Sequence, residues 1–328
     1  MFTHLFFWPR FLVIHVCSLV LVIVGVILKL GQDKDAPLSP ARYKVFVVAC
    51  KIVAFIFTLN NGLWWEKKRT HVDYSKWLGP DWKPTYEGAG IHIGNHQCYG
   101  DITAGFNLLD PFPSFVAKIA TRKMFGIGHI MDSMRCLYIK HRGKAGSAES
   151  KQAVKDQITE AQIEAEEGKR PPVFMYPEGC STNGHYMIKF KKGAFASLRA
   201  VKPYVYNYWS YRGMVTDGAC MHIYMYYIMQ LQAVWSKVTC LELPVFCPND
   251  YFWENHWDGK QDKAGLFADT MREIMAEVGG YKLSDATVDD KLDFKKILKG
   301  KKIEKKPVVK EPAAEPAAEK PEAEKKNE

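Results

Sequence analysis

The amino-acid sequence predicts an α/β fold in which helices flank a mixed sheet, preceded by an apolar helical hairpin and followed by a polar tail. Two long apolar stretches lie in the first 69 residues. From about residue 85 to 298, short apolar runs alternate with segments of helical period, which is typical of α/β domains. We therefore divide the chain into a membrane anchor (1–69), a globular domain (70–300) and a disordered tail (301–328).

Composition excludes several classes of protein. The chain has 328 residues, of which 47% are apolar, and this is enough to bury a sizeable core. Its mean hydropathy of −0.21 excludes a polytopic channel or carrier. The formal charge of +9 suits anionic headgroups, nucleotide-bearing cofactors or nucleic acid equally well. The 8 cysteines form no CxxC pair or Cys/His cluster, so we expect neither a metal site nor a disulfide framework.

The first apolar stretch, residues 11–30, predicts a transmembrane helix, because about 20 apolar residues are needed to cross a bilayer. A cleaved signal peptide is the alternative. The apolar run is longer than the hydrophobic region of such a peptide, and no small-x-small cleavage site follows it.

The second apolar stretch, residues 43–65, contains Lys44 and Lys51 and ends in a Trp pair before a basic cluster. It either spans the membrane or enters and leaves it on one side, with Lys51 reaching the headgroups. The basic residues 67–69 predict that the following domain lies on the cytosolic side.

The globular domain contains several expected elements. Strands are predicted at 91–93 and 173–176, further short elements at 116–120 and 136–139, and a helix at 147–167. Residues 220–246 are apolar, but their polar interruptions favour core elements or a lipid-facing surface over a third span. The tail consists largely of Lys, Glu, Pro and Ala, which cannot bury a core.

Residues 95–101, directly after a predicted strand, carry the first candidate chemistry. A histidine at a strand-to-helix corner can act as a general base, and His96 occupies this place. If a helix begins at residue 97, Asp101 can approach the ring and hold its other nitrogen protonated. Taken alone, the spacing also fits a helix cap beside a buried polar residue.

Residues 176–184 form a second segment that follows a strand. Its glycines, Ser181 and Thr182 offer donors for a phosphate, and the following Lys189, Lys191 and Lys192 add positive charge. The alternative is an ordinary Gly-rich turn beside a solvated Lys run.

The two segments together resemble the glycerolipid acyltransferases, the family of 1-acylglycerol-3-phosphate and lysophosphatidylcholine acyltransferases. The resemblance rests on an NHxxxxD motif at 95–101, followed about 80 residues later by YPEG at 176–179. Further matches are FKKGAF at 190–195, VKP at 201–203 and LPVF at 243–246.

The resemblance implies that residues 70–300 are a catalytic domain, with His96 as general base and Asp101 as its orienting carboxylate. It implies direct attack on a thioester without a covalent acyl-enzyme. Acceptor contacts are expected from a wider set of residues on the two motifs, namely Asn95, Glu178, Gly179, Ser181, Thr182, Lys189 and Lys191.

Two departures from the family pattern leave the acceptor open. Cys180 and Ser181 follow the Glu-Gly pair, where the phosphatidic-acid-forming branch usually has Thr-Arg. The family arginine of the G-x-I-F-I-x-R segment aligns with His141 in one register and Arg142 in the other. We favour Arg142 as a phosphate contact.

The sequence therefore predicts an acyl-CoA-dependent acyltransferase for a lysophospholipid, located in the endoplasmic reticulum membrane with its site facing the cytosol. Its expected partners are acyl-CoA, the acceptor and the bilayer, without a bound cofactor, metal or nucleic acid. The alternatives are a glycerol-3-phosphate acyltransferase, a membrane-anchored esterase or thioesterase, and a membrane tether without activity. The hydrolase alternative lacks a G-x-S-x-G elbow in this sequence.

Overall fold

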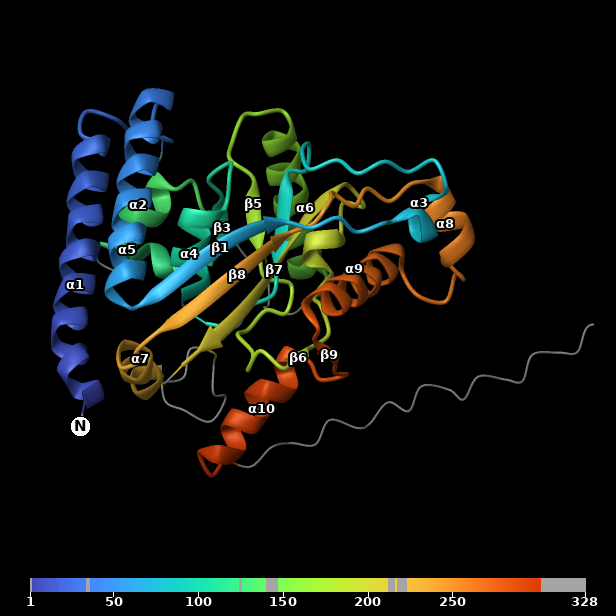
Figure 1. The fold of residues 1–328 in the computed structure, drawn as a ribbon. Helices are drawn as coiled ribbons and strands as arrows, with labels where there is room; N and C mark the ends of the chain where they lie inside the picture. Colours follow the sequence, from blue (N-terminus) through green and yellow to red (C-terminus); the bar gives the residue numbers. More distant parts are fainter. Residues whose placement is uncertain are drawn as a thin grey trace, which may run out of the picture.

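A mixed sheet flanked by helices forms the centre of the computed structural model (Figure 1), which describes residues 2–33, 36–98, 100–123, 126–139, 147–211, 216 and 223–301. Within these residues the sheet has seven strands in the order β1-β8-β7-β2-β5-β3-β4. They are β1 (Leu63–Arg69), β2 (Ile91–Gly94), β3 (Ser114–Lys118), β4 (Leu137–Ile139), β5 (Val173–Met175), β7 (Val201–Ser210) and β8 (Ser236–Glu242). The predicted fold class is confirmed.

The strand directions determine where the loops gather. β2, β5, β3, β4 and β7 run parallel, whereas β8 is antiparallel to β7 and β1 is parallel to β8. The segments that follow β2 and β5 therefore leave the sheet at the same edge. These segments contain the two motifs identified in the sequence.

Helices cover both faces of the sheet because successive side chains of each strand point to opposite sides. One face, with Ile91 and Ile93, packs against α6 (Ala148–Glu166) and α9 (Lys263–Gly279). The other face packs against α2 (Pro40–Asn60) and α4 (Gly100–Leu108). The long helix α1 (Phe2–Lys29) lies beside α2 at the left of Figure 1.

The remaining elements are short connections and a second, two-stranded sheet made of β6 and β9. They are α3 (Ser75–Leu78), η1 (Ile119–Lys123), α5 (Ile127–Ser133), β6 (Tyr186–Met187), η2 (Lys192–Phe195), α7 (Ile223–Leu231), α8 (Asp250–His256), β9 (Lys282–Leu283) and α10 (Val288–Leu298).

The N-terminal hairpin has two helical segments long and apolar enough to cross a membrane, Phe7–Lys29 and Pro40–Asn60, with mean hydropathies of 3.0 and 1.7. Only 22% of each apolar window is buried, and large apolar side chains such as Leu19 and Ile52 face outward. The inner sides of these helices contact α4, α5, α7 and β1. Whether the second segment spans or re-enters stays a prediction.

The predicted end of the second apolar segment at residue 65 is wrong. Helix α2 ends at Asn60, and Gly62 turns the chain with φ of 63°, at a place where a Cβ would lie 2.5 Å from the Val234 carbonyl oxygen. Trp64 and Trp65 then begin β1, so they belong to the sheet and do not end a membrane helix.

The basic residues after the Trp pair also lie on β1. Lys67 and Arg69 form ion pairs with the buried Glu242 at 3.1 and 3.6 Å, and Lys68 pairs with Glu66 at 2.9 Å. These basic residues therefore form ion pairs on a sheet strand, and the cytosolic orientation of the domain stays a prediction.

The other expected elements are largely confirmed. The two predicted strands appear as β2 and β5, the two further short elements overlap the strands β3 and β4, and the helix predicted at 147–167 is α6. The described part of residues 220–246 forms α7 and β8, which agrees with core elements. The predicted tail lies outside the described residues apart from Lys301.

Candidate active site

His96 lies on the loop between β2 and α4, and its ring is held by Asp101. The His96 Nδ1 to Asp101 Oδ2 distance is 2.7 Å. The same carboxylate oxygen accepts hydrogen bonds from the backbone N–H groups of Gln97 at 2.7 Å and Cys98 at 3.1 Å. The expectation of a helix from residue 97 is therefore wrong. α4 begins at Gly100, and Asp101 in its first turn accepts from N–H groups of the loop that precedes the helix.

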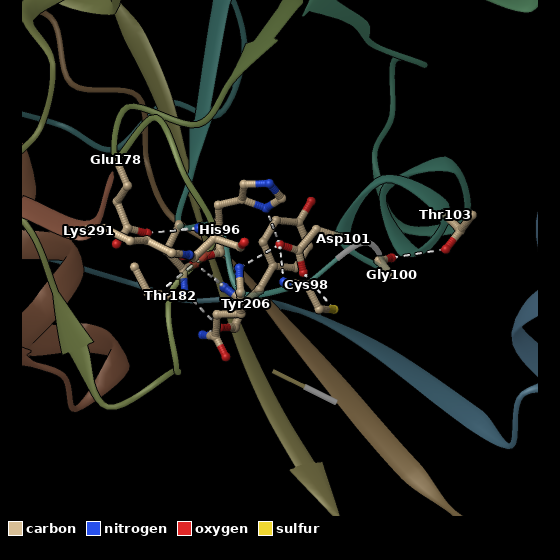
Figure 2. A network of polar contacts seen from close by, with 12 residues as sticks. His96, Cys98, Gly100, Asp101, Thr103, Glu178, Thr182, Tyr206 and Lys291 are labelled. Atoms are coloured by element: carbon tan, nitrogen blue, oxygen red, sulfur yellow. Dashed lines mark hydrogen bonds and ion pairs between the residues drawn. The ribbon is translucent and has the colours of Figure 1, made fainter. Parts of the chain in front are cut away.

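The two ring nitrogens of His96 have different surroundings. Asp101 is fully buried, whereas the His96 side chain is 22% exposed. Figure 2 shows one ring nitrogen directed at Asp101 and the other pointing away from the drawn network. The ring also stacks on Tyr176, with centroids 4.2 Å apart and planes 21° apart. The imidazole is therefore oriented from one edge and one face, and its second nitrogen can meet a reacting hydroxyl.

Glu178, after β5, holds the main chain of His96. Its Oε1 accepts a hydrogen bond from the His96 backbone N–H at 2.8 Å. The residue is 1% exposed, and burial raises the pKa of its carboxyl to about 8. At neutral pH the carboxyl is thus largely protonated. Glu178 acts here on the protein's own backbone, whereas the sequence predicted a substrate contact.

The loop after Glu178 is hydrogen-bonded to the main chain of His96. Thr182 donates from its backbone N–H to the His96 carbonyl oxygen at 2.7 Å and from its hydroxyl at 3.2 Å. Lys291 of α10 donates to the Ser181 carbonyl oxygen (Figure 2). At Gly179, where φ is 71°, an added Cβ would lie 2.7 Å from Cε of Lys191. The side chain of Lys191 therefore packs directly against Gly179.

Asn95 was predicted to contact the substrate, and in this structure its side chain bonds to the backbone of Tyr206. Its amide oxygen accepts from the Tyr206 N–H at 2.7 Å, and its amide nitrogen donates to the Tyr206 carbonyl oxygen at 3.0 Å. Gln97 donates to the same carbonyl at 2.7 Å and to the Tyr281 hydroxyl at 2.6 Å. Both side chains therefore tie the His96 loop to β7.

The structure brings most of the predicted site residues together around the two loops. These are His96, Asp101, Glu178, Gly179, Ser181, Thr182 and Lys191. Lys189 instead forms an ion pair with Asp285 at 3.6 Å, and Lys192 pairs with Asp262 at 2.5 Å. Arg142 and its alternative His141 lie outside the described residues.

Sequence reasoning missed Tyr206, Tyr281 and Gln97, which carry no motif signal. Tyr176 could have been found, because it is the first residue of the YPEG match. Among the residues that the structure describes, no group of three or more His, Cys, Asp or Glu side chains could hold a metal ion.

A histidine held by a buried carboxylate at the carboxyl edge of the sheet, clasped by a Glu-Gly loop, defines an α/β domain equipped for proton transfer to or from a bound hydroxyl. Residues 76–210 match the profile of the protein family described as Acyltransferase. This match agrees with the resemblance of the two motifs to the glycerolipid and lysophospholipid acyltransferases.

Similar proteins agree with this family. The lysophospholipid acyltransferase LPEAT1 of Arabidopsis thaliana is 30% identical over 218 residues, which cover 65% of this chain and 50% of that protein. Lysophosphatidylcholine acyltransferase 1 of Rattus norvegicus is 26% identical over 62% of this chain and 35% of its own length. The chain thus spans half or less of these relatives.

A solved structure shows the same fold. The 1-acyl-sn-glycerophosphate acyltransferase PlsC of Thermotoga maritima superposes with a TM-score of 0.50 over 85% of this chain and 96% of that one, at 13% identity.

Proposed function

We propose that this protein is an acyl-CoA-dependent O-acyltransferase that acylates a lysophospholipid, of the lysophosphatidylcholine or 1-acylglycerol-3-phosphate type. The observation that carries the proposal is the 2.7 Å contact between His96 and the buried Asp101. The family match and the names of the similar proteins support the substrate class.

In the proposed reaction, the oxygen of the acceptor hydroxyl attacks the thioester carbonyl while Nε2 of His96 takes the proton of that hydroxyl. The carbon–sulfur bond then breaks, and the thiolate of CoA leaves with the proton from the imidazolium. Asp101 keeps the proton on Nδ1 and stabilises the imidazolium while it exists.

A covalent intermediate on the nearest thiol is disfavoured. Cys98 is fully buried, and burial together with the Asp101 charge raises the pKa of its thiol well above the usual value. Its Sγ donates to Asp101 Oδ1 at 3.4 Å. This favours direct transfer between the two substrates over an acyl-enzyme.

The test uses the full chain in membranes, labelled acyl-CoA and a panel of acceptors that includes glycerol-3-phosphate. We expect His96→Ala and Asp101→Asn to lower the rate of acylation about 10²- to 10⁴-fold. His71→Ala, at an exposed histidine, is the control and should keep full activity.

Equal label incorporation by wild type and His96→Ala on every acceptor would refute the proposal. Label released as free fatty acid, without acylated lipid, would favour the hydrolase alternative. An endoplasmic reticulum location with the site facing the cytosol stays a prediction.

A further inference from the structure

A cavity of about 540 Å³ lies between the α1–α2 turn and the edge strand β4. The turn, at the upper left of Figure 1, contributes Lys29, Ala36 and Pro37. The rest of the described lining comes from η1, α5, β4, α6 and the segments just before β4 and β5. Arg135 and Arg170 precede β4 and β5, so this end of the cavity lies at the amino edge of parallel strands, whereas His96 follows the carboxyl end of β2.

The cavity is strongly cationic. Lys29, Arg122, Arg135 and Arg170 line it, against a single carboxylate in the described lining, Asp132. Asp132 is bonded to Arg122, with an Nε to Oδ1 distance of 3.1 Å. An excess of positive charge around an open cavity favours an anion with several oxygen acceptors.

Arg170 is incompletely satisfied. Its side chain is 9% exposed, and its Nη2 donates to the Arg135 carbonyl oxygen at 2.8 Å. Glu164 lies 3.7 Å from its Nη1, but the buried Nε has no hydrogen-bond partner among the residues that the structure describes. A buried guanidinium N–H without an acceptor is unfavourable and indicates a place for one.

Arg135 is held in an unusual backbone conformation. Its φ is 58°, in the left-handed region that favours glycine, and its guanidinium donates to the Lys169 carbonyl oxygen at 2.6 Å. Glycine would relieve the backbone at this position but would remove the charge from the cavity. A strained non-glycine residue at a cationic cavity suggests that its side chain is used there.

The surroundings favour an amphiphilic anion. The cavity lies beside the turn that joins α1 and α2, where Ile27 near the end of α1 and Leu30 just after it are exposed. Ile119, which is 41% exposed, is part of the lining itself. Apolar residues therefore stand beside a cationic chamber at one end of the hairpin.

We propose that this cavity binds the phosphate headgroup of an anionic phospholipid, whose chains lie along the outer face of the hairpin. The lipid would bridge the α1–α2 turn and the catalytic domain, at a place separate from His96. This inference does not depend on the proposed acyl transfer, because its test measures binding.

The experiment measures thermal unfolding of the full chain in detergent, with increasing dihexanoyl phosphatidic acid or dihexanoyl phosphatidylcholine. We expect phosphatidic acid to raise the wild-type Tm more than phosphatidylcholine does. Arg135→Gly and Arg170→Gln should each weaken the apparent affinity about tenfold, as expected for a lost charge-assisted contact. Arg135→Lys should retain most of it. Lys260→Gln, which removes one exposed charge elsewhere, should match wild type.

Two outcomes would overturn the proposal. Equal Tm shifts in wild type and Arg135→Gly would mean that the lipid binds elsewhere, for example at the His96 site. A shift of the same size with inorganic phosphate or CoA at equal concentration, lost in Arg135→Gly, would assign the cavity to a free anion. Arg135→Gly should fold at least as well as wild type without ligand, because it relieves the backbone.

Discussion

Replacing Glu178 by glutamine should stabilise the protein at alkaline pH and flatten the pH dependence of its stability. Burial raises the pKa of the folded-state carboxyl to about 8 from the ordinary value of 4.5. Between these values the unfolded chain releases the proton and the folded chain keeps it. Stability therefore falls as pH rises through this window.

The magnitude follows from the gap between the two pKa values. At about 1.4 kcal/mol per pH unit, the group removes about 4 kcal/mol of stability between pH 5 and pH 8. For a protein of this size the loss corresponds to a fall in Tm on the order of 10 °C. Glutamine cannot ionise, yet it keeps an oxygen that accepts the His96 N–H bond.

The assay is thermal unfolding of wild type and Glu178→Gln in detergent at pH 5, 6, 7 and 8. The Tm values of the two proteins should be similar at pH 5, and their difference should grow as the pH rises. Glu254→Gln, at an exposed carboxyl of α8, should follow wild type throughout. Parallel pH profiles for wild type and Glu178→Gln would refute the conclusion that the folded state holds a proton on this carboxyl.

Two further predictions concern the histidine ring and the hairpin. Tyr176→Phe should keep acyl-transfer activity within about twofold, because the ring stack remains and the buried hydroxyl has no hydrogen-bond partner, whereas Tyr176→Ala should lose about 3- to 10-fold. Equal rates for the two variants would show that the stack does not position His96. Ile52→Lys puts a charge on the exposed apolar face of α2 and should release part of the protein from membranes, since such a charge at a helix centre costs about 3 kcal/mol. Lys51→Ile is the control, and unchanged membrane pelleting of Ile52→Lys would exclude this face from the bilayer.

The sequence was sufficient to place His96, Asp101 and the loop at 176–184 directly after two predicted strands. Both motifs directly follow buried strands, and parallel strands bring their carboxyl ends together. The VKP and LPVF matches are also neighbours, since Val201 and Phe246 exchange backbone hydrogen bonds at 2.9 and 3.0 Å. The placement of the two motifs depends on local pattern, whereas the contact between the VKP and LPVF matches comes from the structure.

The sequence could not reveal contacts that depend on distant main chain. Asn95 and Gln97 bond to Tyr206, more than 100 positions away, and no local spacing encodes such a pairing. The Trp64 and Trp65 pair misled for a different reason. An aromatic pair before basic residues occurs both at membrane interfaces and on sheet strands. Only the pairing of β1 with β8 shows that this pair belongs to a strand.

The contacts around His96 explain why the motifs at 95–101 and 176–179 predict an active site only when they occur together. Glu178 accepts from the backbone N–H of His96, and Thr182 donates to its backbone carbonyl, so the second loop grips the main chain at this position. Asp101 and Tyr176 orient the ring, but a ring on an unrestrained loop has no defined position relative to a substrate. Because the grip is on the main chain, it does not depend on the side chain at position 96. His96→Ala therefore removes the imidazole while the contacts from Glu178 and Thr182 remain possible, so a loss of activity in that variant reports on the ring itself.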